Sequence, residues 1–154
     1  MSLLDGVTRS NSIARMRRNG WILTGGIIGV LRGSLGTLSG IATLGSAEQL
    51  DSIVPGYSAI LVYELLMSIL ILAISIFAIV TGGDPSRSGQ IRIGGFAIIA
   101  AGGIDGIWGL ILLQGVDGIA GSVLGTVLAL AIIGTLLVIG AGRLGRTAAS
   151  SADD

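Results

Sequence analysis

Three ionisable side chains interrupt long apolar stretches of this chain: Arg32, Glu64 and Asp105. If these stretches cross a membrane, each charge costs about 2.5–3.5 kcal/mol on insertion scales and therefore needs a partner or a function. At a helical rise of about 1.5 Å per residue, Arg32 and Asp105 lie at similar depths, roughly 16–18 Å beyond the points where their helices enter the bilayer. Glu64 falls near the same depth from the opposite side. We therefore expect an intramembrane charge cluster, with Arg32 facing Asp105 as the simplest pair.

Two carboxylates beside one guanidinium leave an excess negative charge in a site of low dielectric constant. One carboxyl group should therefore be protonated, hydrated or bound to a cation. Glu64 is the expected proton carrier, because Asp105 better matches the depth of Arg32. Three interpretations follow: a static salt bridge with a neutral or water-exposed Glu64, a pathway for protons or cations, or a contact between Arg32 and lipid headgroups.

The composition excludes most other chemistry. The chain has no cysteine and no histidine, which removes thiol nucleophiles, imidazole bases, disulfides and the usual transition-metal ligands. Its nine basic residues are all arginine and are balanced by nine acidic residues, so there is no basic field for nucleic acid. We therefore expect no enzyme activity, no cofactor, no metal and no nucleic-acid partner.

The elements that position these charges are predicted to be four transmembrane helices. Of the 154 residues, 51% are hydrophobic and only 12% are charged, unlike a soluble domain. Apolar runs long enough to span about 30 Å of hydrocarbon cover residues 21–44, 58–80, 93–113 and 119–140. They lack the alternation of barrel strands, so we predict an all-α membrane domain over 21–140. The flanking parts are a cytoplasmic or interfacial segment over 1–20 and a cytoplasmic polar tail over 141–154.

Arginine lies at only one set of helix ends, which predicts the orientation of the chain. Arginines precede the first run, occupy the second loop and follow the fourth run, whereas the first and third loops contain acidic residues and no arginine. We therefore place both termini in the cytoplasm of a multi-pass protein of the cell membrane. A cleavable signal peptide fits the first run less well, because that run contains Arg32. The flanking charges are Arg9, Arg15, Arg17, Arg18, Arg87, Arg92, Arg143 and Arg146 on one side and Glu48, Asp51 and Asp117 on the other.

Glycine recurs at helical spacing in three of the four runs and predicts close contacts between helices. In lipid, helices associate largely through close backbone approach at small residues. The second run has no glycine, and its bulky side chains suit grooves elsewhere. The packing glycines we expect are Gly26, Gly29, Gly33, Gly36 and Gly40 in the first run, Gly102, Gly106 and Gly109 in the third, and Gly118, Gly121 and Gly125 in the fourth.

The two halves of the chain share a short pattern at an offset of 73 residues. Both copies read Gly, two residues, a charged residue, Gly, two residues, Gly, with Arg32 as the charge in the first and Asp105 in the second. Such a pattern fits two parallel hairpin repeats, although chance matches are common in a chain so rich in glycine.

The basic N-terminus, Gly20-Trp21 at the start of the first run and Asp105-Gly106-Ile107-Trp108-Gly109 in the third together resemble small uncharacterised four-helix bacterial integral membrane proteins. The resemblance is architectural and implies no activity.

Two functional hypotheses follow from the sequence. The leading one is a non-enzymatic integral membrane protein that acts by glycine-mediated helix packing, as an accessory or assembly subunit of a membrane complex or as a homo-oligomer. Its partners would be lipids and other membrane helices. The alternative is a small proton- or cation-coupled transporter or channel that uses Arg32, Glu64 and Asp105.

Overall fold

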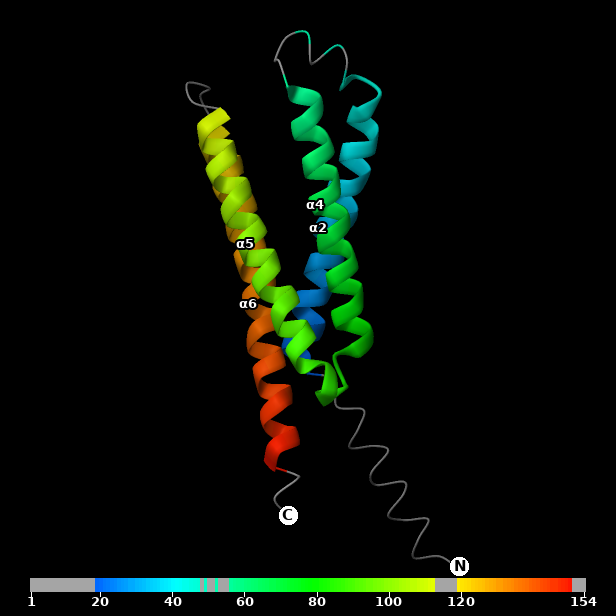
Figure 1. Cartoon of the computed structure of the whole chain (residues 1–154), viewed down its shortest axis with the longest axis vertical. Helices are drawn as coiled ribbons and strands as arrows, with labels where there is room; N and C mark the ends of the chain where they lie inside the picture. The colour runs from blue at the N-terminus through cyan, green and yellow to red at the C-terminus, as the bar shows by residue number, and fades with distance from the viewer. Residues whose placement is uncertain (1–18, 48, 50–51, 53–55, 113–118, 151–154) are drawn as a thin grey trace, which may run out of the picture.

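The computed structural model of this chain describes residues 19–47, 49, 52, 56–112 and 119–150. In this part of the chain, four long helices follow one another, with a short 3-10 helix between the second and third (Figure 1). All four long helices are long and apolar enough to cross a membrane, and no strand occurs among the described residues. The predicted all-α fold, with four helices long and apolar enough to span a membrane, is therefore confirmed for the described residues. The elements are α2 (Gly20–Leu44), α4 (Tyr57–Thr81), η1 (Pro85–Arg87), α5 (Ser88–Leu112) and α6 (Ile119–Ser150).

Two helices extend beyond the predicted apolar runs. α5 begins at Ser88 instead of residue 93, and α6 continues to Ser150 instead of ending at residue 140. The predicted bounds followed hydrophobicity, whereas helix formation depends on backbone propensity. Ala, Leu and Arg in 141–150 favour a helix even where the sequence is too polar for hydrocarbon.

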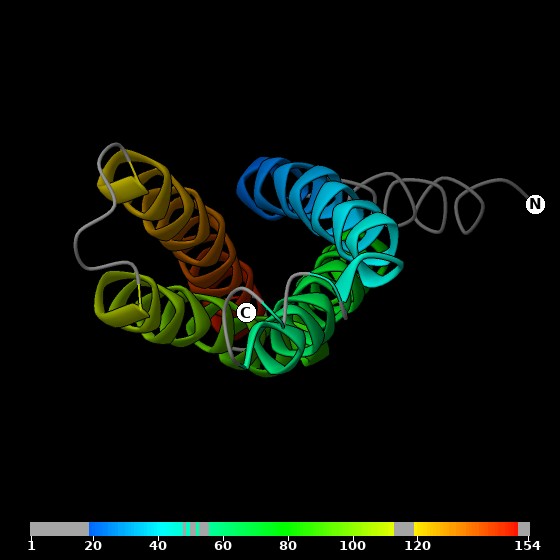
Figure 2. The ribbon, with the colours of Figure 1, turned by 90° about the horizontal axis from the view of Figure 1, so that it is seen from above.

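The four long helices form two hairpins that meet at one end and separate toward the other (Figure 1). α2 packs along α4, and α5 packs along α6. Contacts between the hairpins are less extensive and join α2 to α6 and α4 to α5. Figure 2, which looks along the bundle, shows the far ends of the two pairs standing apart.

The hydrophobic core holds the hairpins together in the half of the bundle where they meet. Its members include Ile22 of α2, Ala78 of α4, Ile91 of α5 and Leu137 of α6, all nearly inaccessible. These residues lie near the beginnings of α2 and α5 and toward the ends of α4 and α6. The joint between the hairpins is therefore at the end of the bundle where α2 begins.

Polar contacts also connect α2 to α6 at this end. Asn19 caps α2, because its side-chain oxygen accepts a hydrogen bond from the backbone N–H of Trp21 at 3.2 Å. Its Nδ2 donates a second hydrogen bond to the carbonyl oxygen of Gly140 at 2.6 Å. The guanidinium of Arg143 lies 5.1 Å from the centre of the Trp21 ring, within the range of a cation–π contact. Asn19, which immediately precedes α2, thus connects the first helix to the last by hydrogen bonds.

The link between the hairpins is a capped single turn. The carboxylate of Asp84 accepts hydrogen bonds from the backbone nitrogen and the hydroxyl of Ser86, at 2.9 and 2.7 Å. These bonds, with a smaller contribution from Arg87, hold the pKa of Asp84 below its usual value. Pro85 starts η1, where no backbone donor is needed.

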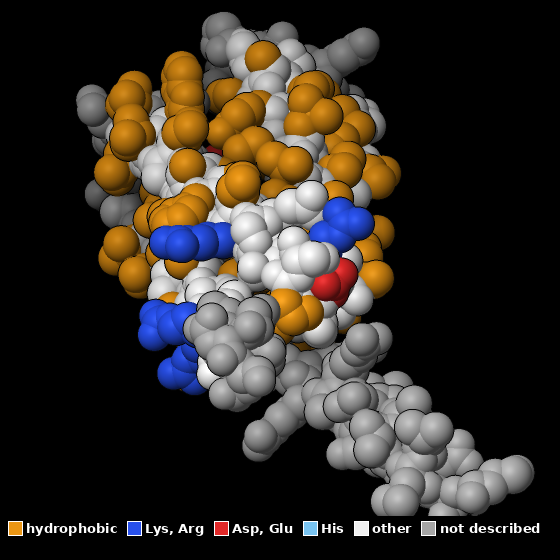
Figure 3. Space-filling model, turned by 60° about the horizontal axis from the view of Figure 1, so that its bottom comes forward, with side chains coloured by type: hydrophobic (Ala, Val, Ile, Leu, Met, Phe, Trp, Pro, Cys, Tyr) orange, Lys and Arg blue, Asp and Glu red, His pale blue; other side chains and the backbone are white. Residues whose placement is uncertain are grey.

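Arginine surrounds the end of the bundle where the hairpins meet. Figure 3 brings this end forward and shows basic side chains beside a larger hydrophobic surface. The described arginines outside the cleft belong to η1, the start of α5 and the end of α6, which all lie at this end. The orientation in the membrane stays a prediction, and the residues 1–18, Glu48, Asp51 and Asp117 that contributed to it lie outside the described residues. The described arginines of this end are Arg87, Arg92, Arg143 and Arg146.

Candidate functional site

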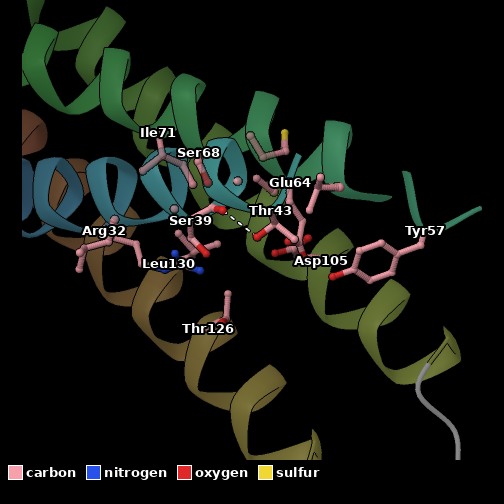
Figure 4. Close-up of a pocket in the computed structure, with 16 residues that line it drawn as sticks. Arg32, Ser39, Thr43, Tyr57, Glu64, Ser68, Ile71, Asp105, Thr126 and Leu130 are labelled. Carbon is pink, nitrogen blue, oxygen red and sulfur yellow. Dashed lines mark hydrogen bonds between the residues drawn. The ribbon is translucent and has the colours of Figure 1, made fainter. Parts of the chain in front are cut away.

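A cleft of about 400 Å³ lies between the two hairpins, and all four long helices contribute to it. We call it the polar cleft, because charged and hydroxyl side chains form much of its wall (Figure 4). Its lining consists of Arg32, Leu35, Gly36, Ser39, Gly40 and Thr43 from α2, Tyr57, Leu61, Glu64, Met67, Ser68 and Ile71 from α4, Ala101 and Asp105 from α5, and Thr126 and Leu130 from α6.

Helical spacing explains why these polar residues share one cleft. On α2, Arg32, Ser39 and Thr43 are separated by seven and four residues and therefore lie on one face. On α4, Glu64 and Ser68 are separated by four residues, and both line the cleft. These side chains line the space that the separation of the hairpins leaves between them.

The structure brings Arg32, Glu64 and Asp105 to this cleft from three different helices. Figure 4 shows Arg32 toward the part of the cleft that Ile71 and Leu130 line, and Glu64 and Asp105 nearer to Tyr57. Arg32 and Asp105 are half-buried, whereas Glu64 is exposed to the cleft.

The three charges influence one another without bonding directly. Asp105 lies within electrostatic range of both Glu64 and Arg32. Among the described residues, however, no ion pair or hydrogen bond joins any two of the three. The direct Arg32–Asp105 pair expected as the simplest arrangement is therefore not formed in this structure. With all three ionised, the cluster carries one excess negative charge.

Sequence reasoning missed the hydroxyl groups of the cleft. Ser39, Thr43, Ser68 and Thr126 all line it, although none was singled out. The signal was available on two helices, because Ser39 and Thr43 follow Arg32 at helical spacing and Ser68 follows Glu64 by four residues. Thr43 donates a hydrogen bond to the carbonyl of Ser39 at 2.8 Å, and its oxygen can still accept one from a bound group.

A buried layer closes the cleft toward the arginine-rich end. Ser75 of α4 is fully buried where Gly29 of α2 and Ile133 of α6 come together. Its hydroxyl has no hydrogen-bond partner among the described residues. This layer lies about one helical turn beyond Ile71 and Leu130, and it separates the cleft from the joint between the hairpins.

The predicted glycines of α2 face α4 at close range. A Cβ atom added to Gly33 would lie 2.8 Å from the backbone nitrogen of Leu72 and 2.9 Å from its Cα, so only glycine permits this approach. The predicted glycines of α5 face α6, where a Cβ at Gly102 would lie 2.8 Å from the Cβ of Leu130. The glycines in these two sets are Gly26, Gly29, Gly33, Gly36 and Gly40, and Gly102, Gly106 and Gly109.

The described α6 glycines of the predicted set make no close helix contact within the chain, so their role in packing stays a prediction. A Cβ at Gly121 or Gly125 would meet no atom within 4 Å in the described structure, and Gly118 lies outside the described residues. The close approach of α6 to α5 occurs instead at Gly134, whose carbonyl oxygen would lie 2.8 Å from a Cβ on Gly95. Gly134 is nine residues after Gly125, about 180° around the helix at about 100° per residue. Gly121 and Gly125 therefore lie on a different face of α6 from the one that packs against α5.

The fold and the cleft define a multi-pass α-helical membrane protein with charged groups between its two hairpins. No known family, curated protein or solved structure matches this chain. The resemblance to small four-helix bacterial membrane proteins therefore stays a prediction, and the function must be argued from the cleft.

Proposed function

We propose that this protein is a small proton- or cation-coupled transporter or channel of the cell membrane, with Arg32, Glu64 and Asp105 as its charge-handling groups. The observation that carries the proposal is that these side chains come from three helices, line one cleft and have no direct protein partner in the described chain. A charge that serves only structure in a membrane is normally paired, because an isolated charge is costly there. Charges that face an open cleft are instead available to a proton, a cation or a solute.

The balance of charge in the cleft suggests a separate role for each of the three ionisable side chains. Arg32 compensates one carboxylate, which leaves the other to take a proton or a cation. Glu64 is the more exposed of the two acidic residues and lines the cleft, so we assign it the exchange of a proton with water there. Asp105 is half-buried within electrostatic range of Arg32, and we assign it the permanent negative charge.

The shape of the bundle supports a mechanism of alternating access. The cleft lies between hairpins that separate at one end and are joined at the other by the core and by the layer around Ser75. With both termini in the cytoplasm, the open end faces outward. Transport then requires the hairpins to part at the Ser75 layer and to close at the other end, by rocking of one hairpin against the other.

The same arrangement supports the proposal of two hairpin repeats. Each hairpin begins with a glycine-rich helix, α2 or α5, that packs against its second helix. Arg32 and Asp105 occupy corresponding positions of the repeated pattern on these first helices and face the same cleft. A duplicated hairpin that changed the sign of one charge would produce this site.

A flux assay tests the proposed function. The protein is reconstituted in liposomes that contain a pH-sensitive dye, and a pH step is applied outside. We expect Glu64→Gln to abolish the proton flux and to leave thermal stability unchanged, because the amide resembles a protonated carboxyl group. Asp84→Asn, which removes a carboxylate at the link between the hairpins, should retain the flux. A Glu64→Gln protein that conducts protons as well as the unmodified protein would refute the proposal.

The second candidate is the accessory subunit or homo-oligomer that the sequence favoured first. The glycine faces of α2 and α5 are occupied within the chain, which leaves them unavailable to another protein. One observation still favours a partner: Gly121 and Gly125 form a small-residue pair on α6 with open space above them. Gly125→Leu should then reduce the mass of the detergent-solubilised particle by light scattering, whereas Gly103→Leu, at another open position on α5, should not. An unchanged mass in both variants would exclude this interface.

A further inference from the structure

We infer that the polar cleft binds a small zwitterion, in which an oxyanion such as a carboxylate contacts Arg32 and an ammonium group contacts Glu64 and Asp105. This inference rests on the proposed function, because it names the class of ligand that occupies the same cleft. The observation behind it is the juxtaposition of one guanidinium and two carboxylates that face a common space without bonding to one another.

The positive charge and the two negative charges occupy different parts of the cleft. Arg32 lies toward the closed part, near Leu130, and the two carboxylates lie nearer to Tyr57 at the start of α4 (Figure 4). A guanidinium binds a carboxylate or phosphate through two parallel hydrogen bonds, and an ammonium group donates three hydrogen bonds that carboxylates accept. If a zwitterion enters with its oxyanion leading, the oxyanion reaches Arg32 and the ammonium group reaches the two carboxylates.

Ligands of one charge fit less well. A simple anion at Arg32 would be repelled by two carboxylates nearby, and a simple cation at the carboxylates would leave Arg32 without an oxyanion partner. A metal ion is not favoured, because the described residues contain no group of three or more acidic side chains that could hold one. A zwitterion brings a negative charge to Arg32 and a positive charge to the two carboxylates, and it adds no net charge to the membrane interior.

The size and the remaining lining agree with a small organic molecule. A volume of about 400 Å³ falls within the usual range of small-molecule sites. Ser68 and Thr126 supply hydroxyl groups that can orient the ligand, and Leu35 and Met67 supply apolar surface for its carbon chain. The ligand chemistry has two sources, since an amino-acid-like solute and the phosphoethanolamine headgroup of a lipid both carry an ammonium group and an oxyanion.

Binding is measured by thermal unfolding of the full chain in nanodiscs, followed by the fluorescence of its two tryptophans. The soluble probes are glycine and 4-aminobutyrate, with acetate and methylammonium as probes of one charge. We expect at least one zwitterion to stabilise the protein in phosphatidylglycerol nanodiscs and neither single-charge probe to match it. Arg32→Lys, which keeps the charge but not the planar fork, and Asp105→Asn should each weaken this binding at least tenfold, whereas Arg87→Gln should not.

The lipid source is tested in nanodiscs that contain phosphatidylethanolamine. Stabilisation by this lipid that depends on Arg32 and Asp105, without stabilisation by the soluble zwitterions, supports the inference and identifies a headgroup as the ligand. Methylammonium binding as strongly as the zwitterions, or zwitterion binding that Arg32→Lys leaves unchanged, would overturn it. The absence of stabilisation by every zwitterion would also overturn it, and the proposed function would survive if Glu64→Gln still abolished proton flux. Arg32-dependent zwitterion binding with normal flux in Glu64→Gln would refute only the coupling to protons.

Discussion

Replacing Gly33 with alanine tests whether glycine sets the distance between α2 and α4. The added Cβ would lie 2.8 Å from the backbone nitrogen of Leu72 and 2.9 Å from its Cα. Carbon atoms in ordinary contact are about 3.5–4.0 Å apart, so the helices would have to part by roughly 0.6–1.2 Å. The obstructing atoms belong to the backbone of a helix and cannot rotate away. Overpacking of this kind costs about 1–3 kcal/mol.

A matched control separates this cost from the effect of alanine on the helix itself. Gly103 lies in the middle of α5, and a Cβ there would meet no atom within 4 Å. Alanine stabilises a helix interior relative to glycine by roughly 0.5–1 kcal/mol, and this gain applies to both positions. The difference in unfolding free energy between Gly33→Ala and Gly103→Ala therefore isolates the packing cost, which we expect to be about 1–3 kcal/mol.

The assay is reversible unfolding in mixed micelles, with tryptophan fluorescence as the probe. Gly33→Ala should be less stable than Gly103→Ala, and Gly103→Ala should be at least as stable as the unmodified protein. Equal stability of the two variants would show that α2 and α4 do not approach each other at Gly33, and the packing argument would fail.

Three further predictions concern the end of the bundle where the hairpins meet. A reporter fused to the C-terminus should be active only in the cytoplasm, and activity on the outer face would reverse the proposed orientation. Asn19→Ala removes the cap on Trp21 and the hydrogen bond to Gly140, so it should lower the unfolding free energy by about 1–2 kcal/mol; an unchanged value would mean that this contact contributes nothing. Ser86→Ala removes the hydroxyl bond that lowers the pKa of Asp84, so the pKa from NMR titration should rise toward the ordinary value. A carboxyl group whose pKa is lowered by folding stabilises the fold at pH values above its unfolded pKa, and this stabilisation is lost as the pH falls through its folded pKa. Ser86→Ala should therefore also weaken the dependence of stability on acid pH. An unaltered titration of Asp84 would contradict this prediction.

The number and type of helices could be predicted because hydrophobic length determines them. Four apolar runs of sufficient length predicted four helices, and the structure has four helices of that kind in the described residues. The ends of α5 and α6 were harder to predict, since the chain near Ser88 and Ser150 is too polar to count as part of an apolar run and is nevertheless helical. Hydrophobicity reports where a chain can enter lipid, and it does not report where a helix ends.

The candidate site could be predicted only in part. The cost of burying charge pointed to Arg32, Glu64 and Asp105, and depth along each helix placed them near one level. Depth alone says nothing about the rotation or separation of helices. For that reason the sequence predicted a direct Arg32–Asp105 pair, whereas the hairpins stand apart and leave a cleft between the two side chains.

The separation of the hairpins follows from where bulky and small residues meet along the bundle. At the joined end, Ile22 fits between the helices because Gly82 and Gly140 leave room for it. Farther along the bundle, Gly121 and Gly125 of α6 face open space, so these small residues do not provide a close contact between α6 and α2. These contacts depend on helix rotation, which a single sequence does not specify.

The central claim is that water reaches the charges between the hairpins from the side opposite the termini. The chain has no cysteine, so single cysteines can be introduced without further changes. Thr126 of α6 lines the cleft, whereas Leu124 and Leu128, two residues before and after it, are exposed outside the cleft and should face lipid. A membrane-impermeant thiol reagent applied from outside should modify Thr126→Cys and leave Leu124→Cys and Leu128→Cys unmodified. Equal modification of all three, or protection of Thr126→Cys, would contradict a water-filled cleft.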